Sequence, residues 1–108
     1  MNILEKASNY LDKIRNKALT VDISYNDEAV KATLGKTIFK IQNEFGIVYI
    51  ESPDFLISVS ALLDVPAKGD AITVGDDEYE VLAPDNEPVW RYTDAYKTTY
   101  RIHTKKVN

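Results

Sequence analysis

Apolar and polar positions alternate along much of this chain. In residues 55–60 and 72–74 every second side chain is apolar, and residues 78–81 continue in the same way. A period of two is typical of strands with one buried face. Glycine-containing segments at 68–69 and 75–77 supply the turns between them. The centre of the chain therefore predicts three strands joined by two turns.

The first 18 residues follow a different period. Apolar side chains recur there at spacings of three and four: Ile3, Leu4, Ala7, Leu11, Ile14 and Ala18. This spacing predicts an amphipathic helix over residues 1–18. An isolated helix of ~18 residues is marginal in water, so its apolar stripe needs a partner. Two roles remain open, because the helix could cap an open end of the sheet or dock on another subunit.

Residues 21–25 alternate and predict a first strand, and residues 29–33 are expected to pair back against it. Residues 34–36 contain a glycine and interrupt the pattern. Alternation resumes in residues 37–42, which predicts another strand.

A turn is expected at residues 43–46, before residues 47–50. The latter segment is apolar on both faces. Such a strand is predicted to be covered on both sides, by the N-terminal helix or by a neighbouring chain.

These segments, with others at 90–92 and 98–105, amount to six to eight short strands. The fold class is therefore predicted to be mainly β (α+β), a small antiparallel β-barrel or sandwich with an N-terminal helix. At 108 residues the chain has the length of a single domain. We expect residues 1–18 to form its helix and residues 19–108 its barrel.

Charge is distributed unevenly along the sequence. Residues 43–88 contain eleven acidic residues and one lysine, a balance of −10, although the whole chain carries only −4. Residues 1–18 carry four basic and two acidic residues, and residues 89–108 carry five basic and one acidic residue. The acidic middle should repel phosphate. It is either a solvated face or a surface with a specific electrostatic role.

Catalytic, metal-binding and cofactor-binding motifs are missing from the sequence. There is no cysteine, and His103 is the only histidine. Alternation places His103 on a strand face between Arg101 and Lys105, where a catalytic base would be held protonated. We therefore expect no enzymatic activity, no metal and no cofactor. The sequence shows no secretory leader or membrane-spanning run, so we expect a protein made and used in solution without a membrane partner.

Several segments resemble one protein family. The run GIVYIESP at 46–53 looks like that family's G-V-x-V-x-G/S-x-P strand, and FLISVSAL at 55–62 looks like its F-x-V-x-x-x-[DE]-hydrophobic segment. The run KGDAITVGDDEYEV at 68–81 is similar to its [KR]-G-D-x-[LI]-x-[IV]-G-x-x-x-[FY]-x-V signature. Residues 90–92 and 100–105 look like the closing segment of prophage-encoded members. The chain thus resembles the head-tail joining proteins of tailed bacteriophages, the lambda-type connector or stopper family.

This resemblance implies a structural virion protein, located at the junction of head and tail. It implies a barrel with an N-terminal helix that is synthesised in the bacterial cytoplasm, is monomeric when free and assembles as a ring. The implied partners are the portal or adaptor proteins of the DNA-filled head, the tail proteins and other copies of the chain. Genomic DNA would pass through the ring without specific binding.

The interaction elements are expected where a partner could complete the order of the chain. These are the N-terminal helix and the segment 34–45, which occupies the position of a long mobile loop in the family but is more strand-like at 37–42. The residues predicted to make contacts are Leu4, Leu11, Ile14, Lys36, Phe39, Lys40 and Phe45.

An alternative function belongs to another class. An SH3-like or OB-like barrel could serve as a binding module, presenting Trp90, Tyr92 and Tyr96 to a peptide or small ligand. The aromatic cluster alone motivates this interpretation.

Overall fold

A computed structural model describes residues 20–108 of the chain. The helix predicted over residues 1–18, with Leu4, Leu11 and Ile14, lies outside the described residues. Within the described part, no helix is long and apolar enough to cross a membrane.

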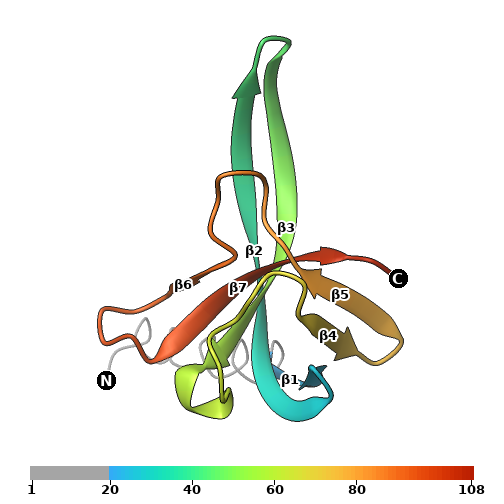
Figure 1. Ribbon diagram of the computed structural model, residues 1–108, viewed down its shortest axis with the longest axis vertical. Helices are drawn as coiled ribbons and strands as arrows, with labels where there is room; N and C mark the ends of the chain where they lie inside the picture. The colour runs from blue at the N-terminus through green and yellow to red at the C-terminus, as the bar shows by residue number, and fades with distance from the viewer. Residues whose placement is uncertain (1–19) are drawn as a thin grey trace, which may run out of the picture.

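Seven strands and one short helix make up the described chain (Figure 1). In order they are β1 (Thr20–Tyr25), β2 (Glu28–Asn43), β3 (Gly46–Ser58), the 3-10 helix η1 (Val59–Ala61), β4 (Ala71–Val74), β5 (Asp77–Val81), β6 (Trp90–Tyr92) and β7 (Thr99–Lys106).

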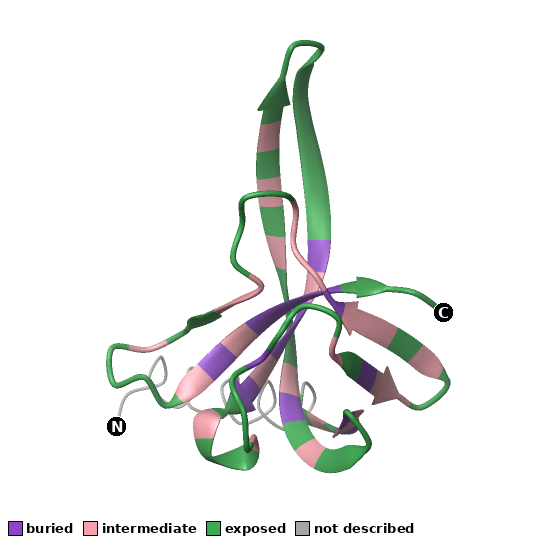
Figure 2. Ribbon diagram, viewed as in Figure 1, coloured by how far each residue is buried: buried purple, intermediate pink, exposed green. Residues whose placement is uncertain are grey.

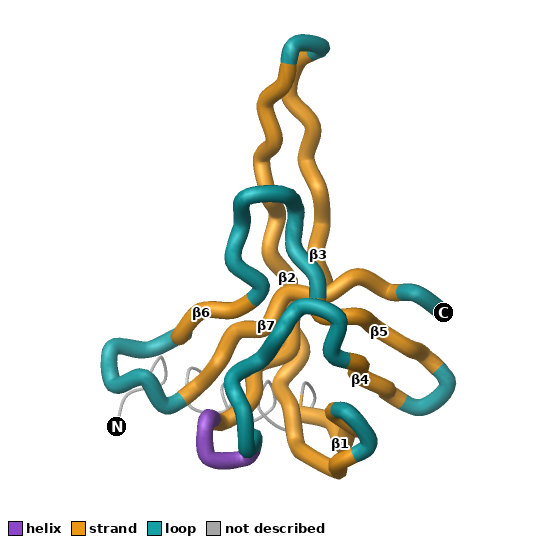
Figure 3. The backbone as a smooth tube through the Cα atoms, in the orientation of Figure 1, coloured by secondary structure: helices purple, strands orange, loops and turns teal. Residues whose placement is uncertain are grey.

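Six of the strands close into an antiparallel barrel. The sheet order is β3-β2-β1-β4-β5-β7-β6, and an additional pairing of β3 with β7 closes the ring of strands. One edge of β7 pairs with β3, and its other edge pairs first with β6 and then with β5. The predicted small antiparallel barrel is confirmed, with β6 as an extra strand (Figure 3).

The core of the barrel comes from alternate positions of these strands. Phe55 and Ile57 of β3 are buried there, beside Ile102 of β7 and Ile72 of β4. The period of two predicted at residues 55–60 therefore holds as far as Ser58. Val59 instead begins η1, because the β3–β7 ladder ends where Ser58 meets Thr99.

The predicted interruption at residues 34–36 is wrong, because β2 continues without a break to Asn43. Gly35 lies inside the strand and leaves room for two side chains of other strands, so it does not mark a turn. A Cβ atom on Gly35 would lie 3.2 Å from Leu56 Cδ1 and 3.4 Å from Arg101 Nη1. Both side chains therefore cross directly over the glycine backbone.

Strands β2 and β3 extend far beyond the barrel. We call residues 36–53 of this hairpin the arm, and it stands above the barrel in Figure 1. The arm lies along the longest of the molecular dimensions, which are 53 × 37 × 30 Å. Residues 47–50 belong to it, and within residues 20–108 they are exposed (Figure 2), so the predicted cover on both faces is not provided by this part of the chain.

Candidate interaction site on the β2–β3 arm

The arm presents apolar side chains on both of its faces. Residues that pair directly across an antiparallel ladder point to the same side. One side, the Phe39 face, carries apolar residues between the polar pair Thr37–Ser52 at the base and Asn43 at the tip: Phe39, Ile41, Val48 and Ile50. The other side, the Lys40 face, mixes charged and apolar residues: Lys36, Ile38, Lys40, Ile47, Tyr49 and Glu51.

Most of these apolar groups are open to solvent, whereas Phe39 and Ile41 are half-buried. Ile38 retains 58% of its surface and Tyr49 retains 65%. A two-stranded ribbon is marginally stable alone in water, and contiguous exposed apolar surface marks interaction sites. The arm therefore has the properties of a surface that is covered in an assembly.

The tip of the arm is the turn predicted at residues 43–46. The backbone N–H of Phe45 donates to Asn43 Oδ1 at 2.8 Å, and Gly46 has a φ of +125°, which favours glycine. The Phe45 side chain is 90% exposed. Because the ring buries almost no surface against residues 20–108, it contributes little to the stability of the isolated chain.

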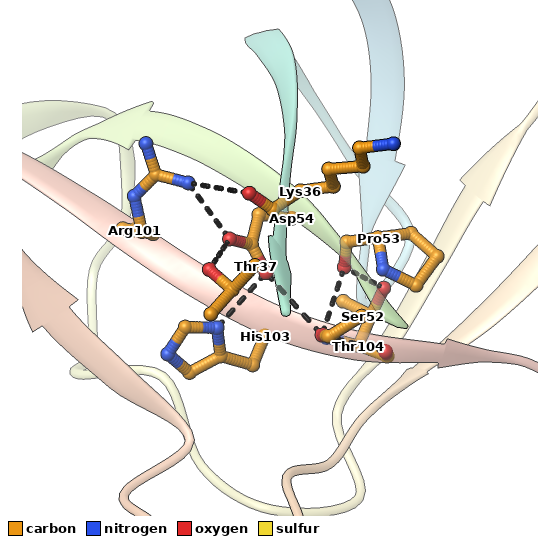
Figure 4. A network of polar contacts seen from close by, with 8 residues as sticks. All are labelled: Lys36, Thr37, Ser52, Pro53, Asp54, Arg101, His103 and Thr104. Carbon is orange, nitrogen blue, oxygen red and sulfur yellow. Dashed lines mark hydrogen bonds and ion pairs between the residues drawn. The ribbon is translucent and has the colours of Figure 1, made fainter. Parts of the chain in front are cut away.

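The base of the arm is fixed by a buried carboxylate. Asp54 of β3 is 1% exposed and accepts hydrogen bonds from Thr37 of β2 and, at 3.3 Å, from Ser52 Oγ (Figure 4). Two groups of β7 also reach it. Arg101 Nη1 lies 2.8 Å from Oδ2, and His103 Nδ1 lies 2.9 Å from Oδ1. One carboxylate thus joins both arm strands to the barrel.

The ionised form of Asp54 is favoured in this cluster. Burial by itself would raise the pKa of the Asp54 carboxyl, but the hydrogen bonds from His103, Thr37 and Arg101 together outweigh burial and lower that pKa below its usual value. Because an ionised carboxylate only accepts, the Nδ1 of His103 is a donor here.

His103 is buried, although the sequence placed it on a basic strand face. It does alternate with the core residue Ile102, but it is only 3% exposed, and the Phe39 ring packs edge-on against it with centroids 5.0 Å apart. Alternation gives the side of the strand on which a residue lies, but it does not show that the arm covers that side. Phe39 is thus a packing residue at the base of the arm.

Backbone groups near this cluster also form hydrogen bonds between β3 and β7. Thr104 Oγ1 donates to the carbonyl of Pro53 at 2.6 Å, and the Thr104 N–H donates to Ser52 Oγ at 3.3 Å. These contacts connect β3 with the last strand at the point where the two diverge. Beside them lies a groove of about 470 Å³ between the arm base at residues 50–53, the loop at 82–84 and residues 104–106.

The sequence profile described as phage head-tail joining protein matches residues 1–108, the whole chain. The chain belongs to this family. No curated protein sequence matches the chain. The family assignment confirms the resemblance found in residues 41–81, and it gives this chain a structural role in joining phage heads to tails. Its implied location is the virion.

The arm of this head-tail joining protein brings together four of the predicted contact residues. Lys36, Phe39, Lys40 and Phe45 all belong to it. Lys36 Nζ lies 3.4 Å from Glu51 Oε1 across the ladder. The sequence did not indicate Ile38 and Tyr49 as contact residues, and it did not indicate the role of Asp54. The available signal for Asp54 was its position as a single acidic residue directly before the apolar run at 55–57.

The K-G-D signature of the head-tail joining protein has a structural explanation. Asp70 accepts hydrogen bonds from the Tyr25 hydroxyl at 2.6 Å and from the Ala67 N–H at 2.9 Å. Gly69, with a φ of +94°, allows the chain to turn around this carboxylate.

Within residues 20–108, no group of three acidic or histidine side chains could hold a metal ion.

The aromatic residues of the alternative hypothesis pack largely on each other. The Trp90 ring lies edge-on to Tyr92 and Tyr100, with centroid distances of 5.0 and 4.9 Å. Tyr92 stacks on Tyr100 at 5.8 Å. Tyr96 is exposed. The contacts of Trp90 and Tyr92 attach β6 to β7, so they explain these rings without a ligand.

Proposed function

We propose that this chain joins the DNA-filled phage head to the tail as a ring around the DNA passage, and that its arm makes contacts within the assembled junction. The observation that carries the proposal is the arm itself: a joining protein that exposes apolar residues on both faces of a 36–53 hairpin. The partners would be portal or adaptor proteins, tail proteins and further copies of the chain. The free chain would be a monomer, synthesised in the host cytoplasm.

The surface charge supports a passage along which DNA moves without specific binding. Asp76 and Glu78 are exposed at and beside the β4–β5 turn, and Asp85 and Glu87 are exposed in the following loop. Two other acids of the negative middle are paired with basic residues of β7, since Asp54 contacts Arg101 and Asp77 contacts Lys106. The exposed acids would oppose phosphate contact along the passage.

The N-terminal segment is proposed as a second contact element. Its stripe contains Leu4, Leu11 and Ile14, and it precedes β1. Removal of residues 1–15 should leave a barrel with a cooperative thermal transition that no longer completes particles. Loss of that transition would instead make the segment part of the folded core.

Complementation tests the function directly. In the phage that encodes the chain, deletion of its gene should leave filled heads and tails unjoined, and the wild-type chain should restore joined particles. A Phe45→Asp variant should fold with an unchanged melting temperature but restore few particles. Leu63→Asp is the matched control, because Leu63 is an equally exposed apolar residue that lies away from the arm, in the loop between η1 and β4. Joined, infectious particles in the absence of the chain would contradict the proposed role.

A further inference from the structure

Both long edges of the arm lack a neighbouring strand within residues 20–108. The pairing of β1 with β2 ends at Thr33, and the pairing of β7 with β3 ends at Asp54. Toward the tip, each arm strand therefore has only the other as its registered partner. The β2 edge at residues 37–43 and the β3 edge at residues 46–51 leave backbone donors and acceptors for a further strand.

The two edges carry opposite charge. Residues 36–43 of β2 contain Lys36 and Lys40 and no acid, whereas residues 46–53 of β3 contain Glu51 and no basic residue. Two β2 edges would therefore repel each other, because lysines on an exposed edge disfavour pairing with a like edge. A β2 edge and a β3 edge attract, because Glu51, although it pairs with Lys36 of its own arm, keeps 65% of its side chain exposed and can also face Lys40 of a neighbour.

Strand direction favours the same combination. In a ring generated by rotation, all arms point the same way, so every β2 strand runs in one direction and every β3 strand in the other. The β3 edge of one copy would then meet the β2 edge of the next in the antiparallel sense that the arm already uses. The contact is heterologous and can repeat around a ring.

We propose that the occupant of each arm edge is the arm of a second copy of this chain, with the β3 edge of one copy paired to the β2 edge of its neighbour. Repeated around the junction, this pairing makes one continuous antiparallel sheet from all the arms. The inference rests on the proposed ring, and it names the surface through which the copies meet. The exposed apolar side chains on each arm face then lie beside side chains of the neighbouring arm, on the same face of a shared sheet.

Disulfide trapping tests the pairing, since the chain has no cysteine of its own. Lys40→Cys is placed on the β2 edge, and Ile47→Cys, Tyr49→Cys or Glu51→Cys on the β3 edge. All four are exposed positions, so the variants should fold. A β2 variant and a β3 variant are produced together during infection, and purified particles are oxidised and run on a non-reducing gel.

At least one mixture should give a disulfide-linked dimer, and this dimer should be missing when either variant is used alone. Glu78→Cys, an exposed position on β5, is the control partner for Lys40→Cys and should give none. Dimers of Lys40→Cys by itself would show pairing between like edges and overturn the proposal. Particles that contain the chain but give no mixed dimer at any of the three β3 positions would also overturn it.

If purified particles lack the chain altogether, the proposed function is wrong, and this outcome is distinct from a failure of the arm pairing.

Charge reversal gives an independent measure of the pairing. Lys40→Glu should reduce the yield of joined particles, and Glu51→Lys in the same chain should recover it. Equal yields from Lys40→Glu and wild type would contradict the role of edge charge.

Discussion

The imidazole of His103 and the carboxylate of Asp54 face each other at 2.9 Å on the side of the β3–β7 ladder opposite the hydrophobic core. Their neighbours Ile102 and Phe55 pair in the same ladder and point into the barrel. The β3–β7 part of the sheet therefore has apolar side chains on its inner side and a buried polar cluster on its outer side. The arm covers that polar cluster through Phe39 and Thr37, so the cluster links the direction of the arm to the barrel.

Asp54→Asn should lower the stability of the folded chain markedly. The substitution removes the charge that pairs with Arg101 and an acceptor of the His103 Nδ1–H, and breaking a buried ion pair costs roughly 3 kcal/mol. Urea unfolding followed by circular dichroism measures the change. Asp22→Asn is the control, because Asp22 pairs with Lys31 on the surface and the loss should stay below about 1 kcal/mol. Equal losses for the two variants would show that burial gives the Asp54 cluster no special weight.

Stability should fall in acid through the same carboxylate. The pKa of Asp54 is lower in the folded chain than in the unfolded chain, so its contribution is present above the ordinary carboxyl pKa of about 4 and is lost as the pH falls through the folded value. The drop in unfolding free energy between pH 7 and pH 3 should be smaller in Asp54→Asn than in wild type. Asp70 and Asp94, whose pKa values are also lowered, remain in both proteins. Parallel pH profiles would exclude Asp54 as a source of the acid sensitivity.

Tyr25→Phe should cost about 1–2 kcal/mol, because it leaves the Asp70 carboxylate without its 2.6 Å donor. Burial and the neighbouring Asp70 raise the pKa of Tyr25. A raised pKa means that this contribution is intact below the ordinary tyrosine value of about 10 and is lost as the pH rises. Unfolding measured at pH 8 and pH 11 should show a steeper alkaline loss in wild type than in Tyr25→Phe. A steeper loss in the variant would contradict this assignment.

Two isoleucines should respond differently to the same change. Ile72→Asp places a charge in the fully buried core and should cost at least about 4 kcal/mol, enough to unfold the domain. Ile38→Asp lies on the exposed arm and should leave the thermal transition of the free chain almost unchanged, while it impairs particle joining. Thermal unfolding and the complementation assay together measure both effects. A large thermal loss in Ile38→Asp would make the arm part of the stabilising core.

The free chain should bind DNA weakly at physiological salt, with a dissociation constant above the micromolar range in a gel shift. The exposed acids at and beside the β4–β5 turn oppose phosphate contact. Replacement of Asp76 and Glu78 by lysine should tighten binding and increase its dependence on salt. Submicromolar binding by the wild-type chain in that salt would contradict a surface along which DNA passes freely.

The sequence by itself determined most of the strands, while the choice between barrel and sandwich was left to the pairing of β3 with β7. A period of two depends only on residues that are adjacent in sequence, since successive side chains of a strand point to opposite faces. A turn glycine likewise determines the conformation of the chain only at its own position. Phe55, Ile57 and Ile72 were therefore identifiable as core positions, and the tip turn at residues 43–46 was identifiable as well. The family resemblance followed from the same local patterns, and the match of residues 1–108 confirms it.

Only the tertiary structure decided which groups meet. From the sequence, Gly35 was predicted to interrupt a strand. In the structure it lies within β2, under the side chains of Leu56 and Arg101, which belong to two other strands. His103 reads as an exposed basic position, but Asp54 lies 49 residues away and reaches it only because β7 pairs with β3. Lys106 likewise meets Asp77 of the acidic middle, so folding partly cancels a charge separation that is clear along the chain. Burial and ion pairing depend on the register of distant strands, and no local period encodes that register.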